Sequence, residues 1–126
     1  MDTTNPILDG LENLPKQSFA AGEYVLKEGK RTDRLYILNQ GRVEVLQKNS
    51  LLYEISDRGS VFGEISALLD VDHTSTVRTL EPSTFYYVDG APEFIRKSPK
   101  FALGLLQILA RRLVGMDYLY FMKGRE

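Results

Sequence analysis

The spacing of hydrophobic residues changes twice along the chain. Between residues 6 and 14, apolar side chains follow an i, i+1, i+4, i+7 pattern, which predicts a short helix that Pro15 ends. From residue 16 to residue 89 the apolar residues mostly alternate with polar ones, as in half-buried strands. After residue 90 the helical period returns, with one short helix over 91–97 and a long one from Lys100 to about Lys123.

Turn residues divide the alternating region into short strands, at intervals of roughly 8–12 residues. Residues 48–50 predict a tight hairpin, and residues 64–69 predict a short helix within the strand region. The expected fold is therefore mostly β with flanking helices. It is an antiparallel β-roll, a jelly-roll-like barrel of about seven or eight strands, with one inserted short helix. We expect a single domain over residues 1–126: an N-terminal helix within 1–15, the roll over 16–89, and C-terminal helices over 90–123.

The charge composition of the chain narrows the classes of binding partner that we expect. The chain has 126 residues, with 16 basic and 17 acidic side chains and a formal net charge of −1. Such a balance gives no overall field to attract nucleic acid or an anionic membrane, so neither is expected as a partner. The sequence contains no cysteine, no signal-peptide pattern at its start and no apolar run near the roughly 18 residues that span a bilayer. A cytoplasmic location is therefore expected.

The sequence contains few residues in arrangements that are typical of catalytic sites. His73 is the single histidine, there is no Gly-x-Ser-x-Gly motif, and no pair of acids stands at a telling spacing. A metal site built from several imidazoles is excluded. We therefore expect no enzymatic activity, no metal and no cofactor.

Three ordered motifs lie at residues 19–29, at residues 35–45, and at residues 59–69 with the following stretch 74–78. Together they resemble the cyclic-nucleotide-binding domain of catabolite-type regulators, kinase regulatory subunits and gated channels. The resemblance extends over about residues 6 to 122. It implies a regulatory domain that binds cAMP or cGMP and signals through its C-terminal helix.

The third motif resembles the family's phosphate-binding cassette. The resemblance implies that Gly63 lets the backbone approach the ligand, that Glu64 accepts a hydrogen bond from the ribose 2′-hydroxyl, and that the amides of Ile65 and Ser66 face the cyclic phosphate. Thr74 would add a hydroxyl donor.

His73 stands where cyclic-nucleotide binders of this family carry an arginine that holds the phosphate. Histidine offers at most one short donor there and is about half charged only near pH 6.5. Three interpretations stay open. The domain binds a cyclic nucleotide through a weakened or protonated His73; it keeps the fold but serves as a dimerisation or interaction module or senses another ligand; or His73 is a solvated loop residue.

The spacing of apolar residues in the last helix predicts a homodimer. Its apolar residues at 105, 109, 113 and 116 are spaced close to heptads and would pair two copies, or pack on the roll. Tyr118, Tyr120 and Phe121 are candidates for covering a purine or for lying in the dimer seam. Arg111 and Arg112 are expected to face water.

Overall fold

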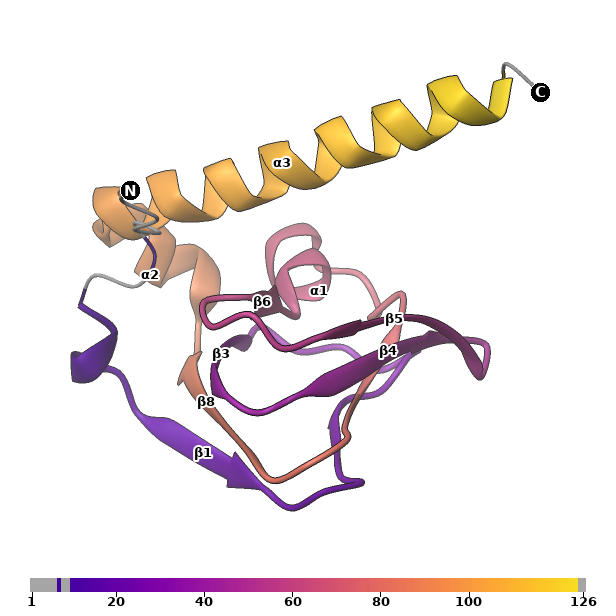
Figure 1. Ribbon diagram of the computed structural model, residues 1–126. Helices are drawn as coiled ribbons and strands as arrows, with labels where there is room; N and C mark the ends of the chain where they lie inside the picture. The colour runs from indigo at the N-terminus through magenta and orange to yellow at the C-terminus, as the bar shows by residue number, and fades with distance from the viewer. Residues whose placement is uncertain (1–6, 8–9, 125–126) are drawn as a thin grey trace, which may run out of the picture.

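The computed structural model describes residue 7 and residues 10–124, and the surroundings of side chains up to residue 115. Within these described residues there are eight strands in two four-stranded sheets, three α-helices and a 3-10 helix, η2 (Leu11–Asn13). Figure 1 shows α3 lying across the top of the roll, with α1 and α2 between the helix and the strands. This arrangement confirms the predicted β-roll with flanking helices.

The first sheet contains β1 (Lys16–Phe19), β3 (Leu35–Gln40), β6 (Val61–Phe62) and β8 (Ser83–Val88), in the order β1-β8-β3-β6. The second contains β2 (Tyr24–Leu26), β4 (Val43–Gln47), β5 (Ser50–Ile55) and β7 (Thr76–Thr79), in the order β2-β7-β4-β5. Each strand pair within the sheets is antiparallel. The β4–β5 hairpin turns at Lys48 and Asn49, which both have a positive φ, as a type I′ turn requires.

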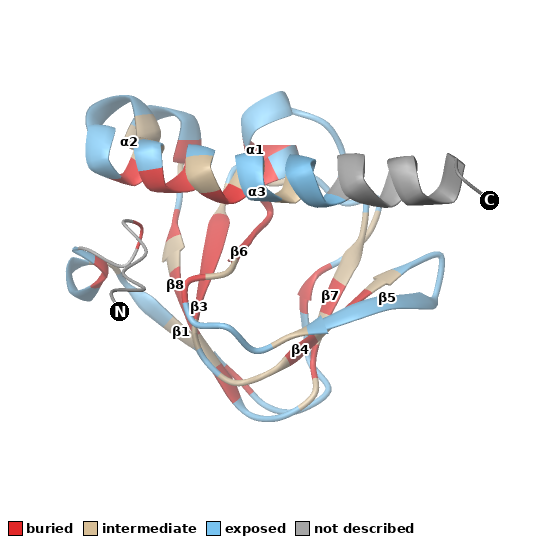
Figure 2. Cartoon of the chain, turned by 45° about the horizontal axis from the view of Figure 1, so that its top comes forward, coloured by how far each residue is buried: buried red, intermediate tan, exposed pale blue. Residues whose placement is uncertain are grey.

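Alternation along β3 builds two cores on opposite faces of the first sheet. Leu35 and Ile37 join the cluster that contains Phe101, Leu105 and Ile108 of α3. Tyr36 and Leu38 point the other way, into the aromatic and aliphatic interior of the roll. The helices are thus held on the outer face of one sheet, and Figure 2 shows buried residues along β3 and on α3 while β5 is largely exposed.

The helical elements are α1 (Glu64–Leu69), α2 (Ala91–Lys97) and α3 (Pro99–Gly124). All three agree with the predicted positions. None of the helices in the described part of the chain has the length and apolar character that a bilayer crossing requires.

The predicted N-terminal helix is shorter than expected and of the 3-10 type in the part that can be checked. Leu11–Asn13 form only a 3-10 helix, because Gly10 before it has a left-handed φ of 78° that no α-helix accommodates. Residues 6, 8 and 9 of that prediction lie outside the described residues.

Candidate functional site

The α1 helix positions the residues that the sequence analysis singled out. Gly63 precedes it with a φ of 89°, a conformation that favours glycine. A Cβ at this position would lie 2.8 Å from the carbonyl oxygen of Arg34, so the close approach of the two segments also requires glycine. Glu64 then begins the helix, and only 8% of its surface is exposed.

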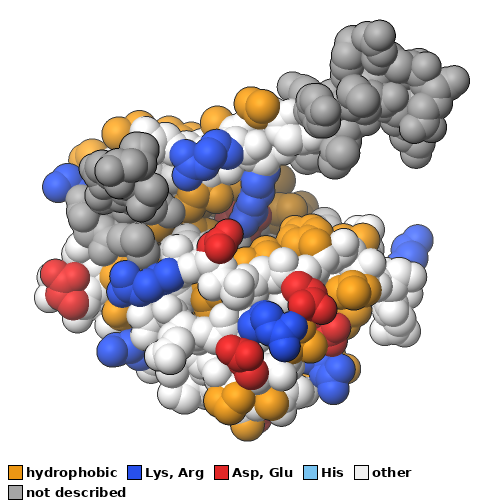
Figure 3. Space-filling view, in the orientation of Figure 1, with side chains coloured by type: hydrophobic (Ala, Val, Ile, Leu, Met, Phe, Trp, Pro, Cys, Tyr) orange, Lys and Arg blue, Asp and Glu red, His pale blue; other side chains and the backbone are white. Residues whose placement is uncertain are grey.

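A hollow of about 400 Å³ lies beside Glu64, between α1, β5 and α3. It is lined by Tyr53, Glu64, Ile65, Leu109, Arg112 and Leu113. Figure 3 shows the space beneath the described part of α3, where blue and red side chains lie beside orange ones. Its volume and its mixture of apolar walls with a few polar groups are typical of small-molecule sites.

Arg112 reaches into this hollow from α3. Its Nη1 donates to Glu64 Oε2, and its Nη2 donates to the carbonyl oxygen of Val61 at 2.8 Å. The expectation that Arg112 faces water is therefore wrong, because Arg112 stands one turn after the buried Ile108 and shares its side of the helix. This contact joins the last helix directly to the start of the cassette.

Ser66 is buried, and its hydroxyl is already engaged. The Oγ accepts from the backbone N–H of Thr32 and donates to the carbonyl oxygen of Thr32, both at 3.0 Å. The side chain therefore ties α1 to the loop before β3. The carbonyl oxygen of Ser66 accepts from the N–H of Asp70 at 2.9 Å, so only the backbone N–H of Ser66 is left for a ligand.

His73 does not join Glu64 and Ile65 in the hollow. It is 6% exposed, so it is not a solvated loop residue, and it lines a different hollow beside β2 and the loop that follows. Burial lowers the pKa of His73 below its ordinary value, against the opposing effects of Asp72 and Glu64. A protonated phosphate contact near neutral pH is thereby disfavoured.

Thr74, the remaining expected donor, is not among the residues that line the hollow at Glu64. Thr74 is exposed, and its carbonyl oxygen accepts from Gln47 Nε2 at 3.0 Å. Arg78 carries an ion pair with Glu44 at 3.3 Å and donates to the carbonyl oxygen of Gly22. In the described part of the chain, no group of three potential metal ligands comes together.

A two-sheet roll, a glycine-started helix with a buried glutamate, and a terminal helix closing over it define a ligand-sensing regulatory domain. Residues 16–92 match the family model described as the cyclic nucleotide-binding domain, and the chain belongs to this family.

The relatives by sequence are kinases and channels. The chain is 39% identical over 67 residues to a cGMP-dependent protein kinase of Eimeria tenella, which covers 53% of this chain and 7% of that protein. It is 30% identical over 78 residues to isozyme 1 of that kinase in Drosophila melanogaster, covering 62% of this chain and 10% of the relative. With potassium/sodium hyperpolarization-activated cyclic nucleotide-gated channel 2 of Mus musculus the identity is 37% over 68 residues, covering 54% and 8%. The chain thus spans about a tenth or less of these relatives.

The solved structures share the fold. The catabolite activator protein of Thermus thermophilus has a TM-score of 0.78 and 21% identity, and the match covers 93% of this chain and 62% of that one. A structure described as Sp-2Cl-cAMPS bound to PKAR CBD2 has a TM-score of 0.65 and 26% identity, covering 88% and 72%. The regulatory subunit of a cAMP-independent protein kinase A from Trypanosoma brucei reaches a TM-score of 0.69 at 21% identity, covering 96% and 46%.

Proposed function

We propose that the chain binds a cyclic nucleoside monophosphate, cAMP or cGMP, in the hollow between α1, β5 and α3. The observation that carries this proposal is the buried carboxylate of Glu64 at the wall of that hollow. A carboxylate is a pure acceptor and suits a ribose hydroxyl. The amides of Ile65 and Ser66, at the start of α1, are the proposed contacts of the cyclic phosphate, and Tyr53 and Leu113 offer apolar surface to a base.

The proposed output passes through Arg112. In the described structure this arginine holds Glu64, the same carboxylate that the ribose hydroxyl would use. A nucleotide that takes over Glu64 therefore favours a different position of α3 over the present one. Differential affinity for two positions of a helix is what an allosteric ligand requires.

A second proposal is that the domain keeps the fold without binding a cyclic nucleotide, and acts as an interaction module or senses another ligand. The observation that favours it is His73, which replaces the expected arginine and lines another hollow. The Trypanosoma brucei neighbour, described as cAMP-independent, shows that this fold occurs in such a protein.

The test is calorimetric titration of cAMP and cGMP into the chain and into Glu64→Gln. The first proposal predicts saturable one-to-one binding that weakens by about 10- to 150-fold in the variant, because a charged acceptor contributes roughly 1.5–3 kcal/mol. Glu93→Gln, on α2, is the matched control and should bind like the parent. Flat traces at millimolar nucleotide would reject the first proposal and favour the second.

We also propose a homodimer through α3, on a different stripe from the expected one. Leu105 is 3% exposed and belongs to the core, so it does not pair two copies, and the side chain of Met116 lies outside the described residues. Leu103 and Leu106 are instead exposed by 52% and 63%, three residues apart on α3. Light scattering should give a mass near twice 14.3 kDa, and Leu106→Glu should halve it. A parent chain that stays monomeric at high concentration would reject the dimer.

The side chains of Tyr118, Tyr120 and Phe121 lie outside the described residues. Their role over a purine or in the dimer seam stays a prediction.

A further inference from the structure

A second hollow, of about 420 Å³, lies where β2 runs into the loop before β3. Its polar lining includes Lys27, Lys30, Thr32, Arg34, His73 and Asp89. It shares no lining residue with the hollow at Glu64. The proposed cyclic-nucleotide site therefore does not account for it.

His73 gives this hollow a donor that nothing else uses. The backbone of His73 is held by two hydrogen bonds: its N–H donates to Lys30 at 2.6 Å, and its carbonyl oxygen accepts from Gly29 at 2.9 Å. Its ring nitrogens make no hydrogen bond to any described residue, although 94% of the residue is buried. No fully buried side-chain nitrogen or oxygen within the described ranges lacks a partner, so the unbonded ring nitrogens of His73 keep some access to solvent, and His73 lines this hollow.

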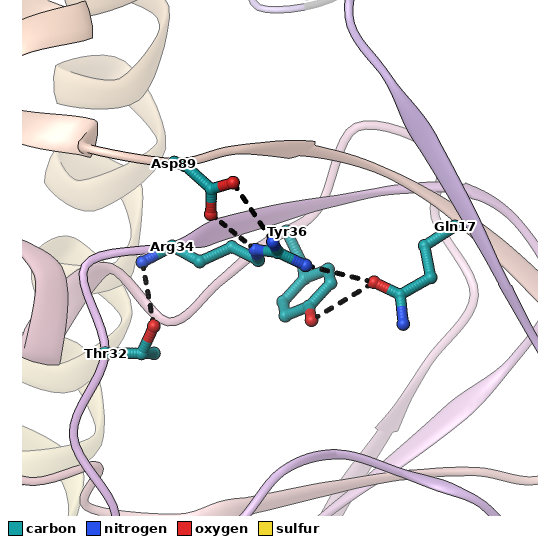
Figure 4. Close-up of polar contacts among 5 residues, drawn as sticks. All are labelled: Gln17, Thr32, Arg34, Tyr36 and Asp89. Atoms are coloured by element: carbon teal, nitrogen blue, oxygen red, sulfur yellow. Dashed lines mark hydrogen bonds and ion pairs between the residues drawn. The ribbon is translucent and has the colours of Figure 1, made fainter.

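Arg34 forms one wall of this hollow, and each of its three guanidinium nitrogens already donates a hydrogen bond. Its Nε and Nη2 donate to Asp89 at 2.6 and 3.0 Å, its Nη1 donates to Gln17 at 3.2 Å, and its guanidinium stacks 4.0 Å from the centre of the Tyr87 ring. Figure 4 shows Arg34 between Asp89 and Gln17. The Asp89 carboxylate raises the pKa of Arg34, and the pair neutralises itself. This wall therefore contributes little net charge.

Lys27 and Lys30 are not neutralised. In the part of the chain that the structure describes, neither ammonium group has a carboxylate within ion-pair distance. Lys27 Nζ instead lies 5.2 Å from the centre of the half-exposed Tyr24 ring. Two lysines without a carboxylate partner thus line the same hollow as the buried imidazole of His73.

The two lysines and the imidazole of this hollow favour an anionic ligand. Two ammonium groups repel a metal cation, and a neutral apolar ligand would leave both charges and the imidazole N–H unpaired. A neutral imidazole still donates one hydrogen bond, and two lysines balance two negative charges. We propose that this hollow binds a phosphate dianion, with Lys27 and Lys30 neutralising its charge and His73 donating one N–H to a phosphate oxygen.

The test is an NMR titration of the full 126-residue chain, followed through its backbone amides, at constant ionic strength and pH 7.5. Inorganic phosphate is one probe and glycerol 3-phosphate, a phosphate monoester, is the other. We expect saturable shifts at Lys30 and His73. Whichever probe binds more tightly shows whether the hollow takes the free ion or an ester.

The variant Lys27→Gln/Lys30→Gln should weaken phosphate binding by about tenfold or more, because charge-assisted contacts are lost. His73→Leu should also weaken it, because leucine offers no N–H to the phosphate. The control Lys97→Gln removes an exposed lysine on α2, outside the hollow, and should bind phosphate like the parent.

Shifts that grow linearly without saturating, or equal affinity in the double variant and the control, would overturn the proposal. Shifts centred on Glu64 and Arg112 would overturn it as well, by assigning the phosphate to the other hollow. Cyclic-nucleotide titrations of the same double variant report separately on the proposed nucleotide site, so failure of one proposal does not mimic failure of the other.

Discussion

Substituting Gly63 by alanine should damage the fold more than the same change at Gly29. Both glycines have nearly the same left-handed backbone, with φ of 89° and 87°. A Cβ at Gly29 meets nothing within 4 Å, whereas a Cβ at Gly63 would lie 2.8 Å from the carbonyl oxygen of Arg34. Comparing the two variants therefore separates the free-energy cost of a left-handed backbone from the cost of the steric contact with Arg34.

The two costs can be estimated. A non-glycine residue in the left-handed region costs about 1–2 kcal/mol, and alanine recovers roughly 0.4–1 kcal/mol by restricting the unfolded chain. Gly29→Ala should thus lose about 0.5–1.5 kcal/mol. At Gly63 the backbone of Arg34 must also move, which adds about 1–3 kcal/mol, as overpacking does in cores.

Urea unfolding followed by far-ultraviolet circular dichroism measures both variants. The expected free energy of unfolding falls by about 2–4 kcal/mol in Gly63→Ala, and the midpoint shifts without a change in slope. Equal losses in the two variants would refute the argument that the approach of Arg34 constrains this position. The same movement would displace Glu64, which follows Gly63 directly.

Three further predictions concern buried or paired side chains. Because burial lowers the pKa of His73, the unfolded chain binds the proton more readily, so stability that is present above about pH 6.5 should be lost as the pH falls. Thermal unfolding at pH 7.5 and at pH 5.5 should show a smaller loss of stability in His73→Gln than in the parent chain. A loss as large as that of the parent would contradict this. Ser66→Ala leaves the N–H and C=O of Thr32 without their partner and should cost about 1–3 kcal/mol in urea unfolding, whereas a neutral result would mean that water replaces the hydroxyl. Asp89→Asn weakens the ion pair with Arg34, but the Asp89 side chain is 61% exposed, so the free energy of unfolding should fall by only about 0.5–1 kcal/mol in urea unfolding. A larger fall would show that solvent screens the pair less than assumed.

Short-range patterns predicted most of the roll. Turn residues placed the β4–β5 hairpin, and the glycine and glutamate at 63 and 64 marked the start of α1. They did not indicate β6, because a two-residue strand is too short to carry a period. They also did not predict that the N-terminal helix is a short 3-10 helix, because the left-handed φ of Gly10 is not encoded in the apolar spacing.

The separation of His73 from Glu64 depends on contacts that are distant in sequence. Counting along the cassette placed the two residues in one site. The backbone bonds of His73 to Gly29 and Lys30, more than 40 residues earlier, instead fix the ring at the other hollow. Sequence spacing gives a position within a loop, but it does not give the side of the loop on which a side chain lies.

The Arg112 contact, by contrast, could have been found from the sequence. The predicted stripe through 105, 109 and 113 starts at a buried residue and then drifts toward solvent, since Leu113 is 60% exposed. The buried face instead contains Phe101, Leu105 and Ile108, at spacings of four and three. Continuing that face by four residues arrives at Arg112, so the helical period itself places this arginine against the roll. A charged residue on the buried face of a helix needs a partner, and Glu64 is the carboxylate that meets it.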